Sequence, residues 1–169
     1  MSGRAWVFGD DVDTDALAPG AYMKGSLAGL ASHCLESLEP TFAEAVRPGD
    51  IVVAGRNFGA GSSREQAAEV LKVLGVEAVL ARSFASIFYR NAFNLGLPAI
   101  ICPQTVGISA GDRLLLEAAA GIVTNETTGG TLVMEPVPPH LAQIVKDGGL
   151  MAHLKAQRSR NAIQGSHEH

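Results

Sequence analysis

The sequence predicts a single α/β domain, and two features of the chain support this fold class. Between residues 51 and 102, short apolar runs typical of buried strands alternate with segments whose apolar residues recur at helical spacing. After residue 102 the pattern changes to three strand-like runs separated by turns, which is typical of an antiparallel meander. The length of 169 residues suits one domain with a substantial core.

The first elements are a strand and a long loop. The run RAWVFG at 4–9 is apolar, whereas 10–25 begins with acidic residues and contains a Pro-Gly turn signal. Residues 27–46 have a weak helical pattern. The turn residues PGD at 48–50 then lead into a second strand, IVVAG, at 51–55.

Two helices follow, and we expect each to end at a glycine. In the first helix, four apolar residues at positions i, i+3, i+4 and i+7 share one face: Ala67, Val70, Leu71 and Leu74. Gly75 then takes the position past the helix end. The same pattern of an apolar helix face followed by a glycine recurs over 83–95 with Gly96. Each of the two helices is followed by a strand, first VEAVLA and then LPAIIC.

The end of the chain combines the meander with a last helical segment. We expect turns at Gly121 and 128–130, and an amphipathic segment over about 140–155 that breaks at Gly148-Gly149. The final residues are polar and lack periodicity. The predicted domain is therefore 1–156, with 157–169 as a disordered tail whose histidines are excluded from functional reasoning.

Composition limits the classes of function. The net charge is −4 and no basic patch stands out, so we expect no nucleic-acid partner. No basic leader precedes an apolar run, and no stretch reaches about 18 consecutive apolar residues, so we expect a cytoplasmic protein without membrane contact. Cys34 and Cys102 lie far apart, which argues against a disulfide framework or a complete metal-ligand set; no metal site is predicted in this chain.

Most of the polar residues suited to binding or catalysis lie in the stretch GRNFGAGSSREQ, at 55–66. Ser62 and Glu65 have the spacing of a capping box, which is a purely structural interpretation. That interpretation leaves Ser63 and Arg64 unexplained, together with the two glycines before them. Free amides, a helix dipole, two hydroxyls and a guanidinium in one place instead predict an anion site.

The known phosphate and nucleophile motifs do not match this stretch. No Lys-Ser or Lys-Thr pair follows Gly61, as a P-loop requires, and Arg64 occupies the last glycine position of a dinucleotide fingerprint. Neither serine has a glycine on both sides at the spacing of a nucleophile elbow. A carboxylate remains as the expected anion.

The loop before this stretch contains three alternating acidic residues: Asp11, Asp13 and Asp15. A calcium loop is excluded because Ala16 and Tyr22 stand where it needs glycine and glutamate. Either the aspartates form a solvated turn, or one of them pairs with Arg64 or orients a substrate hydroxyl. Arg82 is a further candidate functional residue, because it follows a strand and the sites of α/β proteins lie at strand ends.

Two long motifs, GDDVDTDALAPGAYM and NFGAGSSREQAAEVLKVLGVEAVLARSFASIFYRNAFNLGLPAI, resemble the small subunits of isopropylmalate dehydratases and homoaconitases. The resemblance covers about 5–155. It implies the swivel domain of the aconitase superfamily, a compact β/β/α unit with a partly barrel-like sheet and flanking helices. It also implies a large partner subunit that holds a [4Fe–4S] cluster through three cysteines.

The implied reaction is the dehydration and rehydration of a hydroxy-di- or tricarboxylic acid, most simply 3-isopropylmalate in leucine biosynthesis. By match to the family motif, Ser62 is the base, used as an alkoxide, while Ser63 and Arg64 grip the substrate carboxylate. Asp15 matches a loop aspartate that organises the site. The cluster iron of the partner would act as a Lewis acid on the departing hydroxyl.

Departures from the family pattern leave the substrate open. Ala60 stands where relatives carry Cys or Glu, and Gln66 replaces a histidine frequent in aconitases. Lys24 lies in the segment that sets substrate choice in the family, and it either binds a distal carboxylate or lies in solvent. The alternatives are a homoaconitase, a dimethylmalate-type dehydratase, or a non-catalytic anion-binding module.

Overall fold

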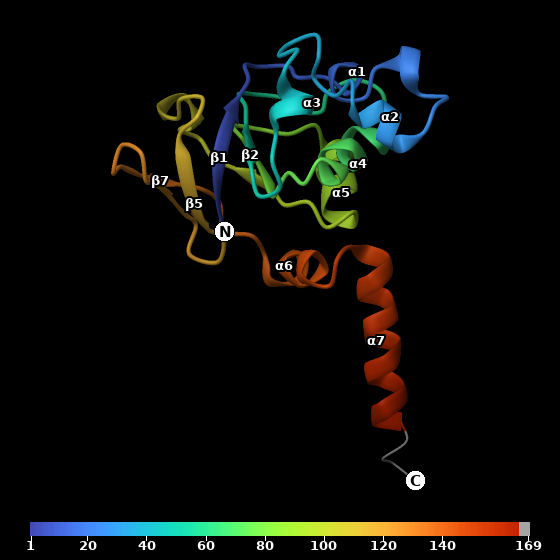
Figure 1. Ribbon diagram of the computed structural model, residues 1–169. Helices are drawn as coiled ribbons and strands as arrows, with labels where there is room; N and C mark the ends of the chain where they lie inside the picture. Colours follow the sequence, from blue (N-terminus) through green and yellow to red (C-terminus); the bar gives the residue numbers. More distant parts are fainter. Residues whose placement is uncertain (166–169) are drawn as a thin grey trace.

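The computed structural model describes residues 1–165, which fold into one mixed sheet with helices packed against it (Figure 1). The strands are β1 (Ser2–Val7), β2 (Ile51–Val53), β3 (Ala78–Ala81), β4 (Ala99–Ile101), β5 (Arg113–Glu117), β6 (Ile122–Asn125) and β7 (Thr131–Val133). The α-helices are α1 (Thr14–Leu17), α2 (Leu27–Ala31), α3 (Phe42–Ala45), α4 (Gln66–Val73), α5 (Ser86–Asn94), α6 (Pro139–Lys146) and α7 (Leu150–Gly165). Two 3₁₀ turns, η1 (Gly20–Tyr22) and η2 (Thr105–Gly107), complete these elements.

The sheet has a parallel half and an antiparallel half. Its strand order within the described residues is β4-β3-β2-β1-β5-β6-β7, with β1 to β4 parallel and β5 to β7 antiparallel. The helices α4 and α5 make the crossovers between β2, β3 and β4. Both predicted halves are therefore confirmed, including the meander after residue 102.

The two faces of the parallel half bury different cores, as alternation along a strand requires. Val52 packs among the helices, whereas Ile51 and Val53 point to the opposite face. That opposite face is lined by apolar residues of the meander, such as Leu114 and Val123. The three-residue strand β2 thus contributes to both cores at once, which explains its uninterrupted apolar sequence.

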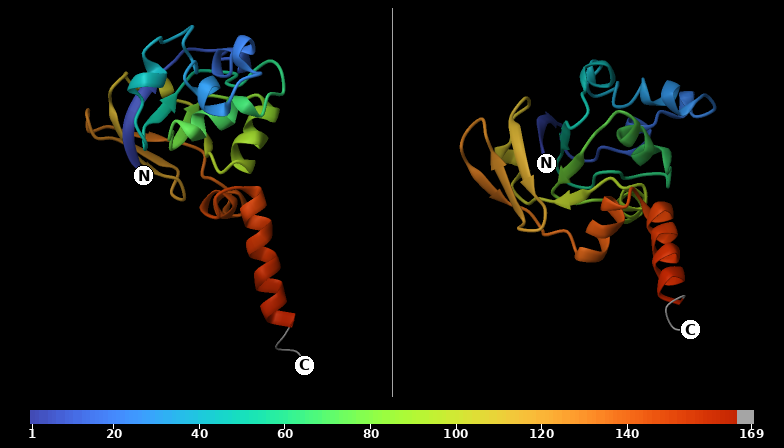
Figure 2. Two further views of the ribbon diagram at one scale, coloured as in Figure 1. Left: turned by 45° about the vertical axis from the view of Figure 1, so that its right-hand side comes forward. Right: turned by 60° about the horizontal axis from the view of Figure 1, so that its bottom comes forward.

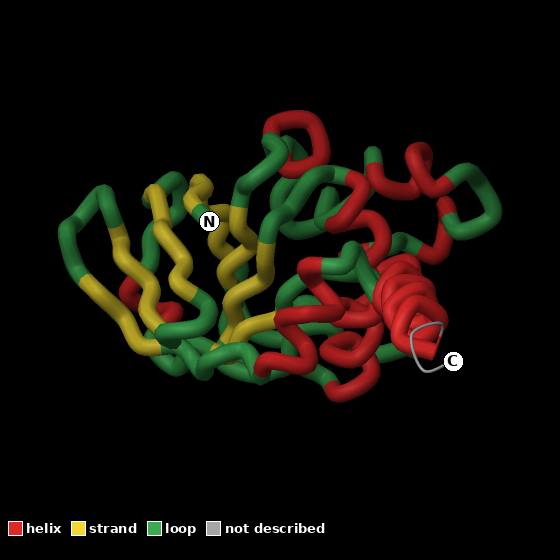
Figure 3. Tube along the Cα trace, turned by 90° about the horizontal axis from the view of Figure 1, so that it is seen from below, coloured by secondary structure: helices red, strands yellow, loops and turns green. Residues whose placement is uncertain are grey.

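The sheet curls until its two edges approach each other. After β7, the amide of Glu135 donates to the carbonyl of Ile101 at the end of β4, at 2.8 Å. The Sγ of Cys102 also lies 3.6 Å from the carbonyl oxygen of Val133. Figure 3 shows the strands from below, with the meander and the parallel strands as two walls of the curled sheet and most helices on the far side of the parallel strands. The predicted partly barrel-like sheet is confirmed.

The C-terminal helices depart from the predicted tail. The break at Gly148-Gly149 is confirmed, since both residues have positive φ and separate α6 from α7. However, α7 continues to Gly165 and projects away from the rest of the domain in both views of Figure 2. The stretch 157–165 is thus part of α7, which follows a turn where His153 contacts Asp147 at 2.7 Å. The rest of the predicted tail, 166–169, lies outside the described residues.

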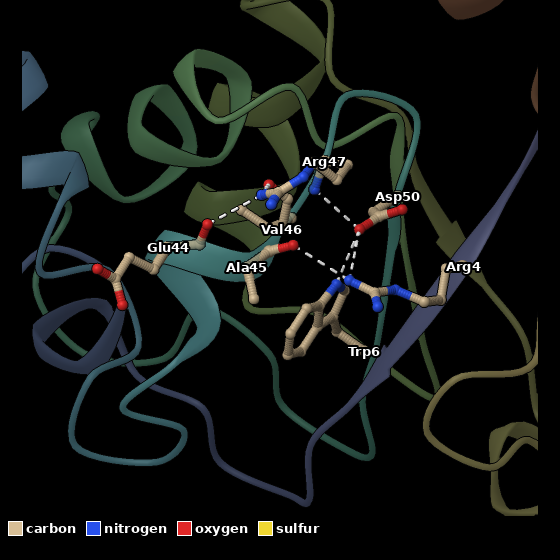
Figure 4. A network of polar contacts seen from close by, with 7 residues as sticks. All are labelled: Arg4, Trp6, Glu44, Ala45, Val46, Arg47 and Asp50. Carbon is tan, nitrogen blue, oxygen red and sulfur yellow. Dashed lines mark hydrogen bonds and ion pairs between the residues drawn. The ribbon is translucent and has the colours of Figure 1, made fainter.

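A buried carboxylate closes the amino end of the parallel strands (Figure 4). One oxygen of Asp50 accepts from the Trp6 indole at 3.0 Å and from the Arg47 amide at 2.9 Å, and forms a 3.5 Å ion pair with Arg4. The Arg4 guanidinium also donates to the carbonyl of Ala45 and lies 4.8 Å from the centre of the Trp6 ring. The network joins β1, the end of α3 and the turn before β2.

Candidate active site

Two loops extend from the carboxyl ends of β1 and β2 and run side by side. Four backbone hydrogen bonds join them: Gly55 to Gly9 (3.1 Å), Asp11 to Arg56 (2.8 Å), Gly59 to Val12 (2.7 Å) and Thr14 to Ala60 (2.8 Å). The strands are parallel, so the acidic loop and the glycine-rich loop leave the same edge of the sheet. This pairing brings together the two stretches that the sequence identified as candidates.

The first three acidic side chains hold the loops in shape. Asp10 accepts from the Arg56 amide at 2.7 Å, and Asp11 accepts from the Asn57 side chain at 3.1 Å. Asp13 accepts from the Ala16 amide at 2.7 Å and so caps α1. Asp11 and Asn57 both have positive φ, a conformation that their short polar side chains tolerate better than other residues do. These carboxylates therefore hold the backbone and side chains of the two loops in place.

Asp15 and Arg64 form an ion pair across the two loops, which is one of the alternatives that the acidic loop left open in the sequence. The Nη1 of Arg64 lies 2.9 Å from the Asp15 carboxylate and also donates to the Ala18 carbonyl at 2.9 Å. The Gly20 amide donates to the same Asp15 oxygen at 3.0 Å. The hydrogen bond from Arg64, and then the one from Gly20, lower the pKa of Asp15 below its ordinary value.

This pair fixes one edge of the Arg64 guanidinium and leaves the other edge open. The Arg64 side chain is only 25% exposed, but within residues 1–165 its other terminal nitrogen has no hydrogen-bond acceptor. A guanidinium held in this way retains donors for a second carboxylate.

Ser62 and Ser63 lie on the exposed turn just before Arg64. Their hydroxyls make no hydrogen bond to any described residue, and neither do the amides of Ser62, Ser63, Glu65 and Gln66. The capping-box interpretation is wrong, because α4 begins only at Gln66 and Ser62 does not accept from Glu65. The Ser62 carbonyl instead accepts from the Arg64 amide at 2.8 Å in a tight turn. The serines and amides are thus available to an anion.

The glycine-rich loop rests on aromatic side chains. A Cβ atom added at Gly59, which has φ +83°, would overlap the side chain of Phe88. Phe58 lies beneath the same loop with its ring centre 5.1 Å from that of Phe88. The glycine is therefore required for the loop to approach α5.

Sequence reasoning missed the role of Ser83, which follows β3. Its hydroxyl accepts from the Asn57 amide at 2.8 Å, and its carbonyl accepts from the Phe58 amide at 3.0 Å. Ser83 therefore supports the loop that carries Ser62. The available signal was its position directly after a buried strand, at the edge where the two loops emerge.

Lys24 lies in the loop between η1 and α2 and is exposed. It has no ion-pair or hydrogen-bond partner in the part of the chain that the structure describes, so the structure does not join it to Arg64 or the serines. The neighbouring Tyr22 ring stacks on His33 at a centroid distance of 3.6 Å, and His33 contacts Glu36 at 2.7 Å. These contacts hold the end of η1 directly before Lys24.

The described residues do not offer a ligand set for an iron–sulfur cluster. They contain no group of three or more histidine, cysteine, aspartate or glutamate side chains arranged to hold a metal ion. Cys34 and Cys102 are buried in separate apolar cores, and burial raises the pKa of both thiols. In addition, none of the helices within residues 1–165 is long and apolar enough to cross a membrane.

Comparison with known proteins agrees with this architecture. Residues 39–105 match the family described as the aconitase C-terminal domain. A 3-isopropylmalate dehydratase small subunit of Archaeoglobus fulgidus is 47% identical over 92% of this chain and 94% of its own length. A methanogen homoaconitase small subunit of Methanothermobacter thermautotrophicus is 51% identical over 90% of this chain and 89% of its own. The crystal structure of 3-isopropylmalate dehydratase from Methanocaldococcus jannaschii has a TM-score of 0.92 at 41% identity, covering 97% and 98% of the two chains.

The curled mixed sheet, its flanking helices and the paired loops define a domain of the aconitase C-terminal type. The matches also extend over nearly the whole chain and nearly the whole of each relative. The chain belongs to the family of small subunits of 3-isopropylmalate dehydratase and homoaconitase.

Proposed function

We propose that this chain is the small subunit of a 3-isopropylmalate dehydratase-type hydro-lyase and that Ser62 removes the substrate proton. The family membership gives the class of activity, and it implies a large partner subunit. The observation that carries the assignment to Ser62 is its exposed hydroxyl, which has no partner in the described chain and lies on a turn rich in free amides. A small carboxylic acid is the proposed substrate.

A serine hydroxyl is a weak base at neutral pH and needs a positive surrounding to act as an alkoxide. The free amides of Ser62, Ser63 and Glu65 present partial positive charge around the hydroxyl. The positive end of the α4 dipole and the Arg64 guanidinium add to it. This field favours the ionised serine, and it also stabilises the negative charge that develops on the substrate as the proton leaves.

Arg64 and Ser63 are the proposed ligands of a substrate carboxylate. The open edge of the Arg64 guanidinium suits a carboxylate in two-point contact, and the Ser63 hydroxyl lies on the same turn. Asp15 would then act through Arg64, because its carboxylate holds the opposite edge of that side chain. In this role Asp15 positions the arginine and does not itself touch the substrate.

In this proposal the large subunit holds the [4Fe–4S] cluster, as the membership in this family of small subunits suggests. When bound there, the cluster would supply a Lewis acid for the substrate hydroxyl. The part of this chain is restricted to binding the carboxylate and moving the proton at Ser62.

The choice of substrate depends in this proposal on Lys24. A free ammonium that reaches the far end of the bound substrate would favour a substrate with a further carboxylate, such as homoaconitate, and a homoaconitase small subunit is among the relatives. An isopropyl group would instead leave Lys24 in solvent. Activity of the reconstituted pair on isopropylmalate, homoaconitate and dimethylmalate separates these alternatives.

The test of the proposal is Ser62→Ala in the pair formed with a cluster-bearing large subunit. We expect turnover to fall by about 10²–10⁴-fold, the usual contribution of a general base, while the pair still forms. Ser86→Ala is the matched control, because Ser86 is also exposed and starts the next helix. Full turnover in the Ser62→Ala pair would disprove the assignment of the base.

A further inference from the structure

Residues 16–35 leave the site and return to it as a closed loop, here called the strap. The strap contains the end of α1, the turn η1 and the helix α2. Its two ends are tied together, because the Leu35 amide donates to the Ala16 carbonyl at 2.8 Å. Leu35 is fully buried and has a φ of +60°, a conformation that is strained for a side chain of this size. The surrounding packing therefore holds the strap closed.

The first part of the strap surrounds the Arg64 guanidinium. The Ala18 carbonyl accepts from Nη1 of Arg64 at 2.9 Å. The Gly20 amide holds the Asp15 carboxylate, which pairs with the same nitrogen. Gly20 is also so close that a Cβ atom added to it would lie 3.6 Å from Nη2 of Arg64. By contrast, the partly buried Arg82 at this edge of the sheet makes no hydrogen bond or ion pair within residues 1–165. The position of the strap thus determines how Arg64 is oriented.

A ring stack holds the far end of η1. The Tyr22 ring lies on the His33 ring, which follows α2, with the ring centres 3.6 Å apart and the planes within 2° of parallel. Nδ1 of His33 lies 2.7 Å from the Glu36 carboxylate, and because a carboxylate only accepts, this nitrogen carries the hydrogen. The turn η1 has three residues and no side-chain hydrogen bond at its start. So short a turn has little stability of its own, and the stack stabilises its position.

We propose that His33 is a positioning residue for Arg64 and that it acts through the stack with Tyr22. The stack holds η1, and η1 in turn presents the Gly20 amide to Asp15. The inference rests on the proposed function in one respect, the binding of a substrate carboxylate by Arg64. His33 itself does not touch the substrate.

The first test measures the pKa of the Asp15 carboxyl in the lone chain by carbon-13 NMR. The hydrogen bond from Arg64, and then the one from Gly20, lower this pKa. His33→Ala removes the ring and releases η1, so it should move the pKa of Asp15 upward. His33→Phe keeps a flat ring for Tyr22 to stack on and should leave this pKa at its wild-type value.

The matched control is His140→Ala, at an exposed position near the start of α6, and it should not change the pKa of Asp15. Thermal unfolding of each variant verifies that it folds. We expect all three variants to do so, because Tyr22 is 39% exposed and the His33 side chain is 33% exposed. Changes at such partly exposed positions cost less global stability than changes in a core.

The second test uses the pair formed with a cluster-bearing large subunit. His33→Ala should raise KM for isopropylmalate by about fivefold or more and lower kcat by less than about twofold. The reason is that a hydrogen-bonded contact with the carboxylate depends steeply on the position of Arg64, whereas the positive field at Ser62 changes little over a small displacement. His33→Phe should restore the wild-type KM.

The outcomes separate this inference from the proposed function. An unchanged pKa of Asp15 in His33→Ala would overturn the inference whatever happens to turnover, because this measurement needs neither substrate nor a partner. A loss in His33→Phe as large as in His33→Ala would overturn the role of the stack. A changed preference between isopropylmalate and homoaconitate with an unchanged pKa of Asp15 would place the effect at Lys24 and also overturn the inference. If the pKa moves as expected but Ser62→Ala keeps full turnover, the proposed base fails and the positioning of Arg64 by the stack stands.

Discussion

An arginine–aspartate pair lies at each end of the parallel strands, and the two ends differ in burial and in how fully their polar groups are hydrogen-bonded. At the amino end, the Asp50 side chain is 9% exposed and receives donors from Trp6, Arg47 and Arg4, all within the chain (Figure 4). At the carboxyl end, the carboxylate partner of Arg64 is 68% exposed, and the neighbouring hydroxyls and amides have no partner among the described residues. The amino end satisfies its polar groups for the fold, whereas the carboxyl end leaves donors for a ligand.

This difference predicts which property each end controls. A buried carboxylate that has lost its donors destabilises the native state, so changes at the amino end should appear in the free energy of unfolding. Exposed donors that the fold does not use contribute little to that free energy, so changes at the carboxyl end should appear in turnover. Variants at the two ends test whether stability and turnover separate in this way.

The largest effect after the loss of the Ser62 hydroxyl should come from Arg64→Gln. Glutamine lacks the charge and the planar fork, so it loses the Asp15 pair and the proposed contact with the substrate carboxylate. We expect kcat/KM of the reconstituted pair to fall by about a hundredfold, equivalent to about 3 kcal/mol of transition-state binding. Arg90→Gln, at an exposed position on α5, is the control and should change kcat/KM by less than about twofold. Equal losses in the two variants would mean that Arg64 acts only through general charge.

The next effect tests how the fold holds the catalytic loop. Gly59→Ala places a methyl group against Phe88 at a positive φ, and we expect the free energy of unfolding to fall by about 2–4 kcal/mol. Gly129→Ala is the matched control, because Gly129 has nearly the same φ, +79°, and an added Cβ would meet no atom within 4 Å. It should cost only about 1 kcal/mol, so the difference in urea denaturation isolates the overlap. Similar losses in both variants would show that the loop moves away from α5 at little cost.

Much of the fold could be predicted because its signals are local. The helical spacing of Ala67, Val70 and Leu71 predicts α4, and the glycine that follows this helix predicts where it ends. The length of α7 could not be predicted in this way, because its polar residues lack periodicity and the helix forms from propensity and an anchored first turn. Within 27–46 the weak pattern corresponds to the short helices α2 and α3, separated by turns.

The site was predictable as residue types but not as contacts. The motif identified Arg64 and Asp15, and their pairing across 49 positions depends on the parallel register of β1 and β2. The spacing of Ser62 and Glu65 suggested a cap, but the turn at Ser62 delays the helix until Gln66. The free Arg82 guanidinium could not be inferred at all, since the absence of an acceptor is a property of the folded neighbourhood.

At the amino end of the parallel strands, Asp50→Asn should lower the free energy of unfolding without a matching loss of turnover. Asparagine keeps the shape but removes the charge that Arg4 faces, and only one of its two terminal side-chain atoms can accept a hydrogen bond. We expect the free energy of unfolding in urea to fall by about 1–3 kcal/mol. Glu77→Gln, an exposed carboxylate at the same end of the sheet, should change it by less than about 0.5 kcal/mol. A loss of turnover per folded pair as large as that of Arg64→Gln would break the division between the two ends.

The smallest effect concerns the protonation of Asp15. Because the Arg64 contact lowers its pKa, the ionised carboxylate stabilises the native state above the ordinary aspartate pKa, and this contribution is lost as the pH falls through the lowered value. Carbon-13 NMR of the side-chain carboxyl should therefore show that the pKa of Asp15 lies below that of an ordinary aspartate, and Arg64→Gln should move this pKa upward. The Gly20 amide also lowers the pKa, so part of the shift should remain in that variant.

The same sign means that the pair stays intact throughout the neutral range. Asp15→Asn should consequently alter turnover by the same factor at every pH above about 5, where an aspartate of ordinary or lowered pKa is already ionised. A pH–rate profile whose acidic limb between pH 5 and 7 disappears in Asp15→Asn would contradict this, because it would require Asp15 to gain a proton where the Arg64 contact keeps it charged. That outcome would make Asp15 a proton carrier. A ratio of wild-type to Asp15→Asn turnover that does not change with pH instead supports the role of Asp15 as the residue that positions Arg64. In that case Ser62 remains the residue proposed to carry the proton.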